Sequence, residues 1–277
     1  MDIQMFFNTL DRLFSEKRPQ EAEAFMRERL SQAEKESDAG AVVTICNELG
    51  GYYRAVSRYE EGVPLYQRAL QIIADLHQEG TPAHGTTLIN YATTCTMKRD
   101  FEKALQLYEE AAAIFSGPDY GPDFNLATLY NNMSFVCQDM GDFSRAEDYL
   151  LKALGILRQL TESDIEIATT YTNLANLYMA MGKVSEARDL LEKAIDIYLR
   201  ETGGKDVHYA ASVSALGDLC YLEGDYASAS QQFEQALTLV ERDYGTDNDS
   251  YRTIEKNLSL SRQQLEKKAH GESDKNE

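Results

Sequence analysis

The sequence predicts an all-α protein, built as a right-handed superhelical solenoid of antiparallel helix pairs. Small residues recur at fixed positions every 41 or 42 residues, and large apolar residues recur between them. The central small column is Gly62, Ala104, Ala146, Ala187 and Ala229, and each member is followed seven positions later by an alanine. Because small side chains let helix backbones approach closely, these columns predict about five copies of one helix pair.

The second helix of each pair is predicted to begin at a large residue, with another on the same face seven positions later. These pairs are Tyr59 and Tyr66, Phe101 and Tyr108, Phe143 and Leu150, Val184 and Leu191, and Tyr226 and Phe233. They fall where small residues of the first helix leave room. That first-helix column is Gly50, Ala92, Ser134, Ala175 and Gly217. The turn inside a pair, as in Gly141-Asp142, offers a glycine for a left-handed C-cap and a polar residue to cap the next helix. The first copy of this turn, Ser57-Arg58, lacks the glycine.

The same register assigns residues 1–268 to a single domain. Residues 1–38 are a divergent helix pair, Asp2–Phe14 followed by Pro19–Ser37. Five repeats then occupy about 40–245. A capping helix spans about 247–268, with an outer face rich in Lys, Arg and Gln. Residues 269–277 contain no apolar residue beyond alanine, so we expect a disordered tail.

The charge of the chain limits the class of partner. A net charge of −19 over 277 residues argues against nucleic acid, which requires a concentrated basic face, and against anionic lipid surfaces. The negative field favours a basic protein or peptide as partner, although solubility alone also explains it. The amino terminus has no signal-peptide pattern, and no apolar run reaches the ~18 residues of a membrane span. We therefore expect a cytoplasmic protein that does not bind membranes.

The sequence offers no catalytic or metal-binding constellation. The four cysteines occupy core columns without any Cys-x-x-Cys pair, so we expect small buried thiols. The four histidines are not spaced to pair with a nucleophile or a metal. Gly204-Lys205 is not part of a phosphate loop, because Leu199 and Asp206 stand where Gly and Ser or Thr are needed. We expect no enzymatic activity, no cofactor and no metal.

The order small-x-x-(Tyr/Cys), tight turn, aromatic-x-x-Ala, aromatic-x-x-Ala resembles the tetratricopeptide repeat. The period is longer than the usual ~34 residues. Segments such as Pro64–Leu70 and Ala168–Ala175, and loops such as Gly117-Pro118-Asp119, look like the repeats of kinesin light chains. Armadillo and HEAT repeats have similar periods, but the three small columns match the tetratricopeptide register better. The resemblance covers about residues 40–262 and implies a protein-protein interaction module or scaffold.

In solenoids of this family the first helices line the concave groove, and the resemblance places one column of each first helix there. This column reads Glu48, Asn90, Asn132, Asn173, Ala215 and Asn257. Asparagine is a mediocre helix former, so its recurrence indicates a use for the amide, which can bond both the N–H and the C=O of an extended peptide. The resemblance implies peptide binding by Asn90, Asn132 and Asn173. The alternative is that these amides bond neighbouring repeats or water.

Other residues of the same face complete the predicted peptide-binding groove. Asn47 and Asn131 lie in the adjacent column, and Asn176 lies one turn beyond Asn173. The side chains expected to give specificity are Arg54, Phe135, Met179, Asp218 and Tyr221. The central columns lack the lysines and arginines with which another groove type of this superfamily clamps a peptide C-terminus, so that mode of binding is disfavoured.

We therefore predict a non-enzymatic protein that binds an extended peptide segment of a partner. One alternative is a peptide-sensing regulator whose solenoid changes shape on ligand binding. Another is a self-assembling structural adaptor with a dimer face formed by Ile3, Phe6, Phe7, Leu10 and Phe14. The sequence leaves the oligomeric state open, with a monomer favoured, and does not identify the partner.

Overall fold

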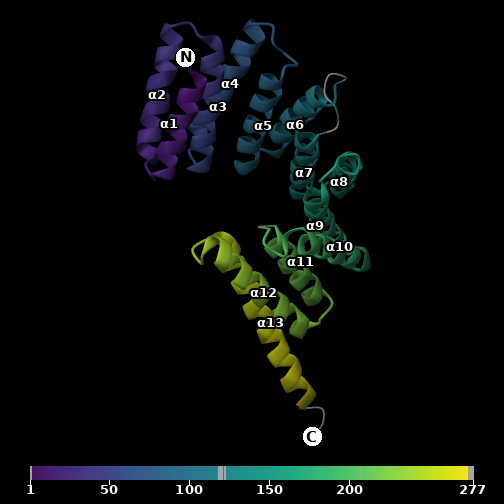
Figure 1. Cartoon of the computed structure of the whole chain (residues 1–277). Coiled ribbons are helices and arrows are strands. Elements are labelled where there is room, and N and C mark those ends of the chain that lie inside the picture. Colours follow the sequence, from purple (N-terminus) through teal and green to yellow (C-terminus); the bar gives the residue numbers. More distant parts are fainter. Residues whose placement is uncertain (1, 118–120, 122, 207, 274–277) are drawn as a thin grey trace. The chain divides into compact units, whose positions relative to one another are not determined.

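A computed structural model describes the backbone of residues 2–117, 121, 123–206 and 208–273, with side chains up to residue 268. These residues form thirteen α-helices and no strand, which confirms the predicted all-α class (Figure 1). The helices are α1 (Ile3–Ser15), α2 (Pro19–Lys35), α3 (Ala39–Ala55), α4 (Tyr59–Asp75), α5 (Pro82–Met97), α6 (Phe101–Phe115), α7 (Phe124–Asp139), α8 (Phe143–Leu157), α9 (Asp164–Ala180), α10 (Val184–Thr202), α11 (Tyr209–Leu222), α12 (Tyr226–Tyr244) and α13 (Asp249–Ser273). Pro118 and Asp119 of one predicted loop, and residues 274–277 of the predicted tail, lie outside the described residues.

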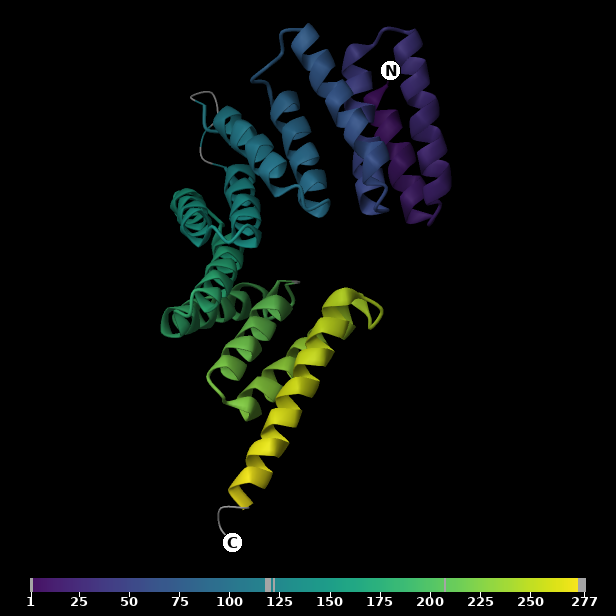
Figure 2. The same cartoon turned by 180° about the vertical axis from the view of Figure 1, so that it is seen from behind.

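The helices form the predicted pairs and stack through their first members. Within each repeat the two helices pack together, as α3 with α4 and α11 with α12. First helices also contact each other, as α3 with α5, α7 with α9, and α9 with α11. The last helix, α13, packs along α12 and also contacts α11 (Figure 2). Odd-numbered helices therefore form a row of first helices within each part of the chain.

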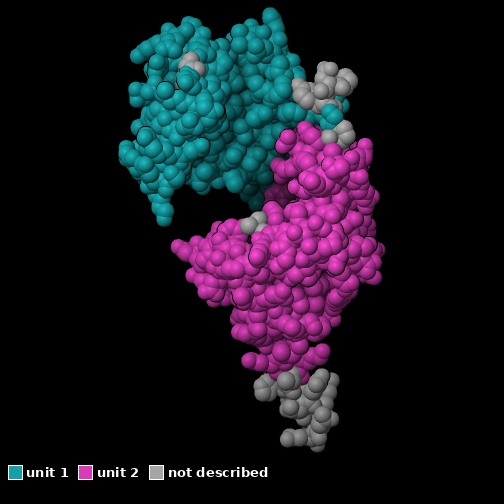
Figure 3. All heavy atoms as spheres, viewed as in Figure 1, with its two compact units in different colours: residues 1–121 teal, residues 122–277 magenta. Residues whose placement is uncertain are grey.

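Contacts divide the chain into two compact units, where we predicted one domain. Unit 1 is Met1–Gly121, with α1 to α6, and unit 2 is Pro122–Glu277, with α7 to α13 (Figure 3). The predicted divergent pair is α1 and α2. The predicted capping helix is α13, which continues to Ser273, beyond the end that we placed at residue 268.

The tight turn inside each pair takes a left-handed residue whether or not that residue is glycine. Gly141 has φ 78° and Ser57 has φ 59°. In both turns the next backbone N–H reaches back to the last turn of the helix: Arg58 N donates to Tyr53 O at 2.7 Å, and Asp142 N donates to Cys137 O at 2.8 Å. The Asp142 side chain also accepts a hydrogen bond from Arg145 N at 3.1 Å, which confirms the predicted N-cap.

The large column of the second helices is buried against the small column of the first helices. Its members Tyr66, Tyr108, Leu150, Leu191 and Phe233 are at most 2% exposed. A Cβ added at Gly50 would lie 2.6 Å from Tyr66 Cζ, and one at Gly217 would lie 2.7 Å from Phe233 Cε1. At these two positions the aromatic ring rests directly on the backbone of the first helix, so glycine is required by the close approach.

Two further predictions are settled by burial. All four cysteines are buried and form no disulfide, and burial raises the pKa of Cys46 and of Cys95 to about 11, which keeps these two thiols protonated and unreactive. The apolar residues of the alternative dimer face on α1 do not form one exposed surface, because Phe6 and Leu10 are 2% and 3% exposed and belong to the core of unit 1, whereas Ile3 and Phe14 are exposed. Phe6 and Leu10 pack inward there with Met26 of α2.

We predict that Gly50→Ala lowers the free energy of unfolding by about 1–3 kcal/mol, because the fully buried Tyr66 ring cannot move away from the added methyl group. The matched control is Gly51→Ala on the next residue, where an added Cβ meets nothing within 4 Å. That change should raise the free energy of unfolding by about 0.5–1 kcal/mol through helix propensity alone. Urea unfolding of both variants checks the pair, and equal effects of the two changes would contradict the packing described here.

Candidate peptide-binding face

In unit 1, the predicted asparagines form a chain of hydrogen bonds between α3 and α5. Asn90 Nδ2 on α5 donates to Asn47 Oδ1 on α3 at 3.0 Å. Asn47 Nδ2 in turn donates to Thr87 Oγ1 at 2.9 Å and to Val43 O at 3.0 Å. Asn47 thus uses both of its N–H groups and its carbonyl inside the protein, and it ties one first helix to the next.

Unit 2 repeats this arrangement between α7 and α9. Asn173 Nδ2 donates to Asn131 Oδ1 at 2.8 Å. Asn131 Nδ2 donates to Thr170 Oγ1 and to Ala127 O, each at 3.1 Å. Because the same pattern occurs in two separate units, we attribute these hydrogen bonds to the repeat itself rather than to one local environment.

The hydrogen bonds sort the predicted asparagines into two groups. Asn47 and Asn131 have no free donor. Asn90 and Asn173 each donate once and keep one N–H and the Oδ1 without a partner among the described residues, beside an exposed surface. Their neighbours Asn132 and Asn176 are exposed, and the described residues offer their side chains no partner.

Two threonines, Thr87 and Thr170, are essential members of this arrangement that our sequence reasoning missed. Both are fully buried, and each hydroxyl also donates to the carbonyl four residues earlier, Ala83 O at 2.7 Å and Glu166 O at 2.8 Å. Each hydroxyl therefore accepts the asparagine N–H. The available signal was a buried column that holds threonine or serine at 87, 170 and 212.

The other predicted residues lie on the same helices but differ in their contacts. Phe135 is 55% exposed. Arg54 is half-buried, and its Nη1 donates to the backbone carbonyl of Asn90 at 3.4 Å. Arg54 therefore lies next to Asn90 on the same face of unit 1. Tyr221 packs edge-on against Tyr226 with ring centroids 5.2 Å apart, and Met179 packs in a cluster with Leu191. The side chains of Tyr221 and Met179 are therefore partly buried against the core.

The pattern changes between α11 and α13, where the asparagine column holds Ala215. Asn257 Nδ2 on α13 donates to Asp218 Oδ1 on α11 at 3.0 Å. On the other side of α11, the hydroxyls of Ser212 and of Thr172 on α9 are hydrogen-bonded at 2.7 Å. Beside α11 lies a cavity of about 590 Å³ that includes Asn176 and Asp218 in its lining. Burial raises the pKa of the Asp218 carboxyl to about 6, opposed by the hydrogen bond from Asn257.

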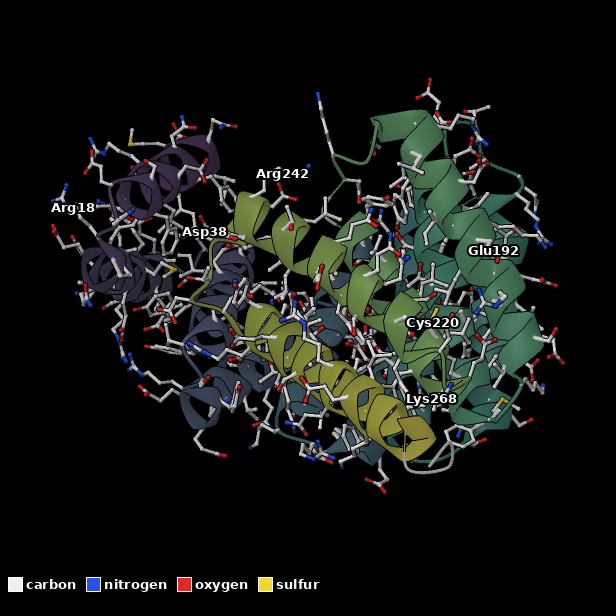
Figure 4. All side chains as sticks on the ribbon, turned by 90° about the horizontal axis from the view of Figure 1, so that it is seen from below. Arg18, Asp38, Glu192, Cys220, Arg242 and Lys268 are labelled. Atoms are coloured by element: carbon white, nitrogen blue, oxygen red, sulfur yellow. The ribbon has the colours of Figure 1, made fainter. Side chains whose placement is uncertain are left out.

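The described residues contain no group of three or more His, Cys, Asp or Glu side chains placed to hold a metal ion. Among them, no helix is long and apolar enough to cross a membrane. Figure 4 labels Cys220 of α11, which is 5% exposed and packed within unit 2.

The repeat geometry described above is that of helical-hairpin repeat proteins, and sequence comparison identifies the class. Residues 41–116 and 166–242 match one sequence model of the tetratricopeptide repeat, and residues 126–164 match another. These matches cover more than half of the chain, which therefore belongs to the tetratricopeptide repeat family.

Its repeats are of the long-period type found in kinesin light chains. The chain is 26% identical over 207 residues to "Protein KINESIN LIGHT CHAIN-RELATED 3" of Arabidopsis thaliana; this match covers 74% of the chain but only 32% of that relative. Its fold is similar to the crystal structure of BtubC (BKLC) from P. vanneervenii, with a TM-score of 0.69 and 21% identity over 83% of this chain and 94% of that one. It is also similar to a putative kinesin light chain of Podosopora anserina, with a TM-score of 0.60 and 20% identity over 72% of this chain and 95% of that one.

We predict that the charged Asp218 carboxylate destabilises unit 2 at neutral pH. Its pKa is about 6 in the folded protein against 3.8 for an ordinary aspartate, so the folded state binds the proton more tightly and loses stability as the pH rises from about 4 to above 6. Asp218→Asn keeps the acceptor for Asn257 and removes this loss. At pH 7.5 its free energy of unfolding should exceed that of the wild type by about 1–3 kcal/mol. Urea unfolding at pH 4.5 and 7.5 checks this, and a difference that does not change with pH would refute it.

Proposed function

We propose that this protein is a non-enzymatic interaction module that holds an extended segment of a partner protein on the faces of its first helices. The observation that carries the proposal is the state of Asn90 and Asn173. Each is fixed by one bond to the preceding first helix and still offers one N–H and one carbonyl. An amide held in this way can bond both polar groups of a peptide backbone without first losing rotamer entropy.

Exposed residues beside these amides extend the surface in each unit. Asn132 and Asn176 add free amides in unit 2, and Phe135 adds an exposed aromatic ring. In this proposal Asn47 and Asn131 position the binding residues and do not touch the peptide. Backbone contacts give affinity that depends little on sequence, so specificity arises from side chains such as Phe135, Arg54 and Asp218.

We further propose a basic protein partner, a reducing compartment and a monomeric state. Membership of the tetratricopeptide repeat family supports a protein partner, and the net charge of −19 favours a basic one. Four buried cysteines that form no disulfide support a reducing compartment such as the cytoplasm. The burial of Phe6 and Leu10 removes the centre of the dimer face that we considered, which supports a monomer.

The test is a binding screen with a library of acetylated, amidated nonapeptides, read by fluorescence polarisation. We expect Asn132→Ala combined with Asn176→Ala to weaken the best peptides at least about tenfold, the cost of one or two hydrogen bonds, while the melting temperature changes little because neither amide bonds within the described protein.

The matched control is Gln231→Ala, which removes an exposed amide from the second helix α12. It should leave peptide affinity unchanged. Failure of the whole library to bind, or binding that survives the double substitution intact, would contradict the proposed function.

A further inference from the structure

The cavity beside α11 lies where the asparagine column is interrupted. Ala215 stands where equivalent first helices carry Asn90, Asn132 and Asn173, and it is 4% exposed at the cavity wall. A longer side chain at this position would occupy the space. The resulting cavity of about 590 Å³ is bounded by α9, α11, the end of α12 and the start of α13, all within unit 2.

The walls of this cavity are apolar, and its polar groups are oxygen-rich. Ala210, Ala215, Val240 and Ile254 provide the apolar wall. The polar lining is Asn176, Ser214, Asp218, Tyr244, Asn248, Asp249, Ser250 and Thr253, and it includes no lysine or arginine. The cavity therefore combines a hydrocarbon surface with a set of hydrogen-bond acceptors.

Asp218 is the carboxylate of this lining that lacks a counter-charge. Its Oδ1 accepts the bond from Asn257, and no described Lys, Arg or His lies within salt-bridge distance of it. The other carboxylate, Asp249, is paired with Arg252 at 2.9 Å. A half-buried carboxylate without a cation is unfavourable, and a cationic ligand would relieve that cost.

We propose that this cavity binds a lysine or arginine side chain of the partner segment, with the charged head at Asp218 and the methylene stem against the apolar wall. Long cationic side chains bind in this divided manner, with the stem on apolar surface and the head on a polar group. The inference rests on the proposed function, since it names a basic side chain in the bound segment. It also identifies Asp218 as one negative charge of the chain that would contact the basic partner directly.

The ionisation of the cavity supports this assignment. With a pKa of about 6, Asp218 is charged at neutral pH and becomes neutral below it. The other titratable groups of the lining are Tyr244 on α12 and Asp249 on α13, while α9 contributes only the neutral Asn176. Binding of a cation should therefore weaken as the pH falls from 7.5 to 5.

The test uses n-butylammonium, which reproduces the end of a lysine side chain, as a probe of the full chain by two-dimensional amide NMR. We expect saturable shifts at the backbone amides of Ala215, Asp218 and Thr253 at pH 7.5. Affinity should fall at least about tenfold in Asp218→Asn and also at pH 5, which corresponds to about 1.4 kcal/mol. The uncharged probe n-butanol should give much weaker shifts.

Glu192→Gln is the matched control, because it removes one acid from α10 (Figure 4), outside the cavity lining, with a side chain that is 61% exposed. It should leave n-butylammonium binding unchanged. Equal binding to wild type and Asp218→Asn, equal loss in Glu192→Gln, or no binding at all would each overturn the inference. All of these measurements keep Asn132 and Asn176 unchanged and use n-butylammonium rather than a peptide, so the cavity and the peptide-binding face can fail separately.

Discussion

The close approach of the two helices of each repeat is the constraint on which the rest of this structure depends. A large side chain of the second helix lies on a small residue of the first, and at Gly50 and Gly217 the ring touches the backbone itself. This contact fixes the separation and rotation of the pair. First helices are thereby held near enough to each other for short polar side chains to bond between them, as Asn47 and Asn90 do.

The same constraint explains why one face holds both fully engaged amides and amides with free hydrogen-bonding groups. Asn90 and Asn173 each link two first helices by one hydrogen bond and are only half-buried. Asn131 is used completely by Asn173, Thr170 and Ala127, whereas Asn173 is used only in part. Where Ala215 breaks the column, the bonds shift to Asp218 and Asn257, and space for a side chain opens. The interruption thus changes the chemistry of the face locally without disturbing the packing of the helices.

Periodicity was sufficient to predict the helices, the buried columns and the turns, because these follow from local contacts repeated at a fixed interval. Even the turn at Ser57, which has no glycine, keeps the left-handed conformation of its equivalents. Hydrogen-bond partners were harder to predict. Asn47 and Asn90 occupy different columns and different helices, and only the rotation of both side chains decides which amide is used. The division into two units and the continuation of α13 to Ser273 depend on packing that no single repeat encodes.

Hydrogen exchange of the side-chain NH₂ groups measures directly which asparagine amides are already engaged in hydrogen bonds within the protein. Asparagine Nδ2 signals can be assigned by single substitutions to glutamine and followed by NMR in water. We expect the Nδ2 protons of Asn47 and Asn131 to exchange slower, by on the order of tenfold, than those of Asn132 and Asn176. Equal rates for all four amides would show that the face is not divided into engaged and free amides.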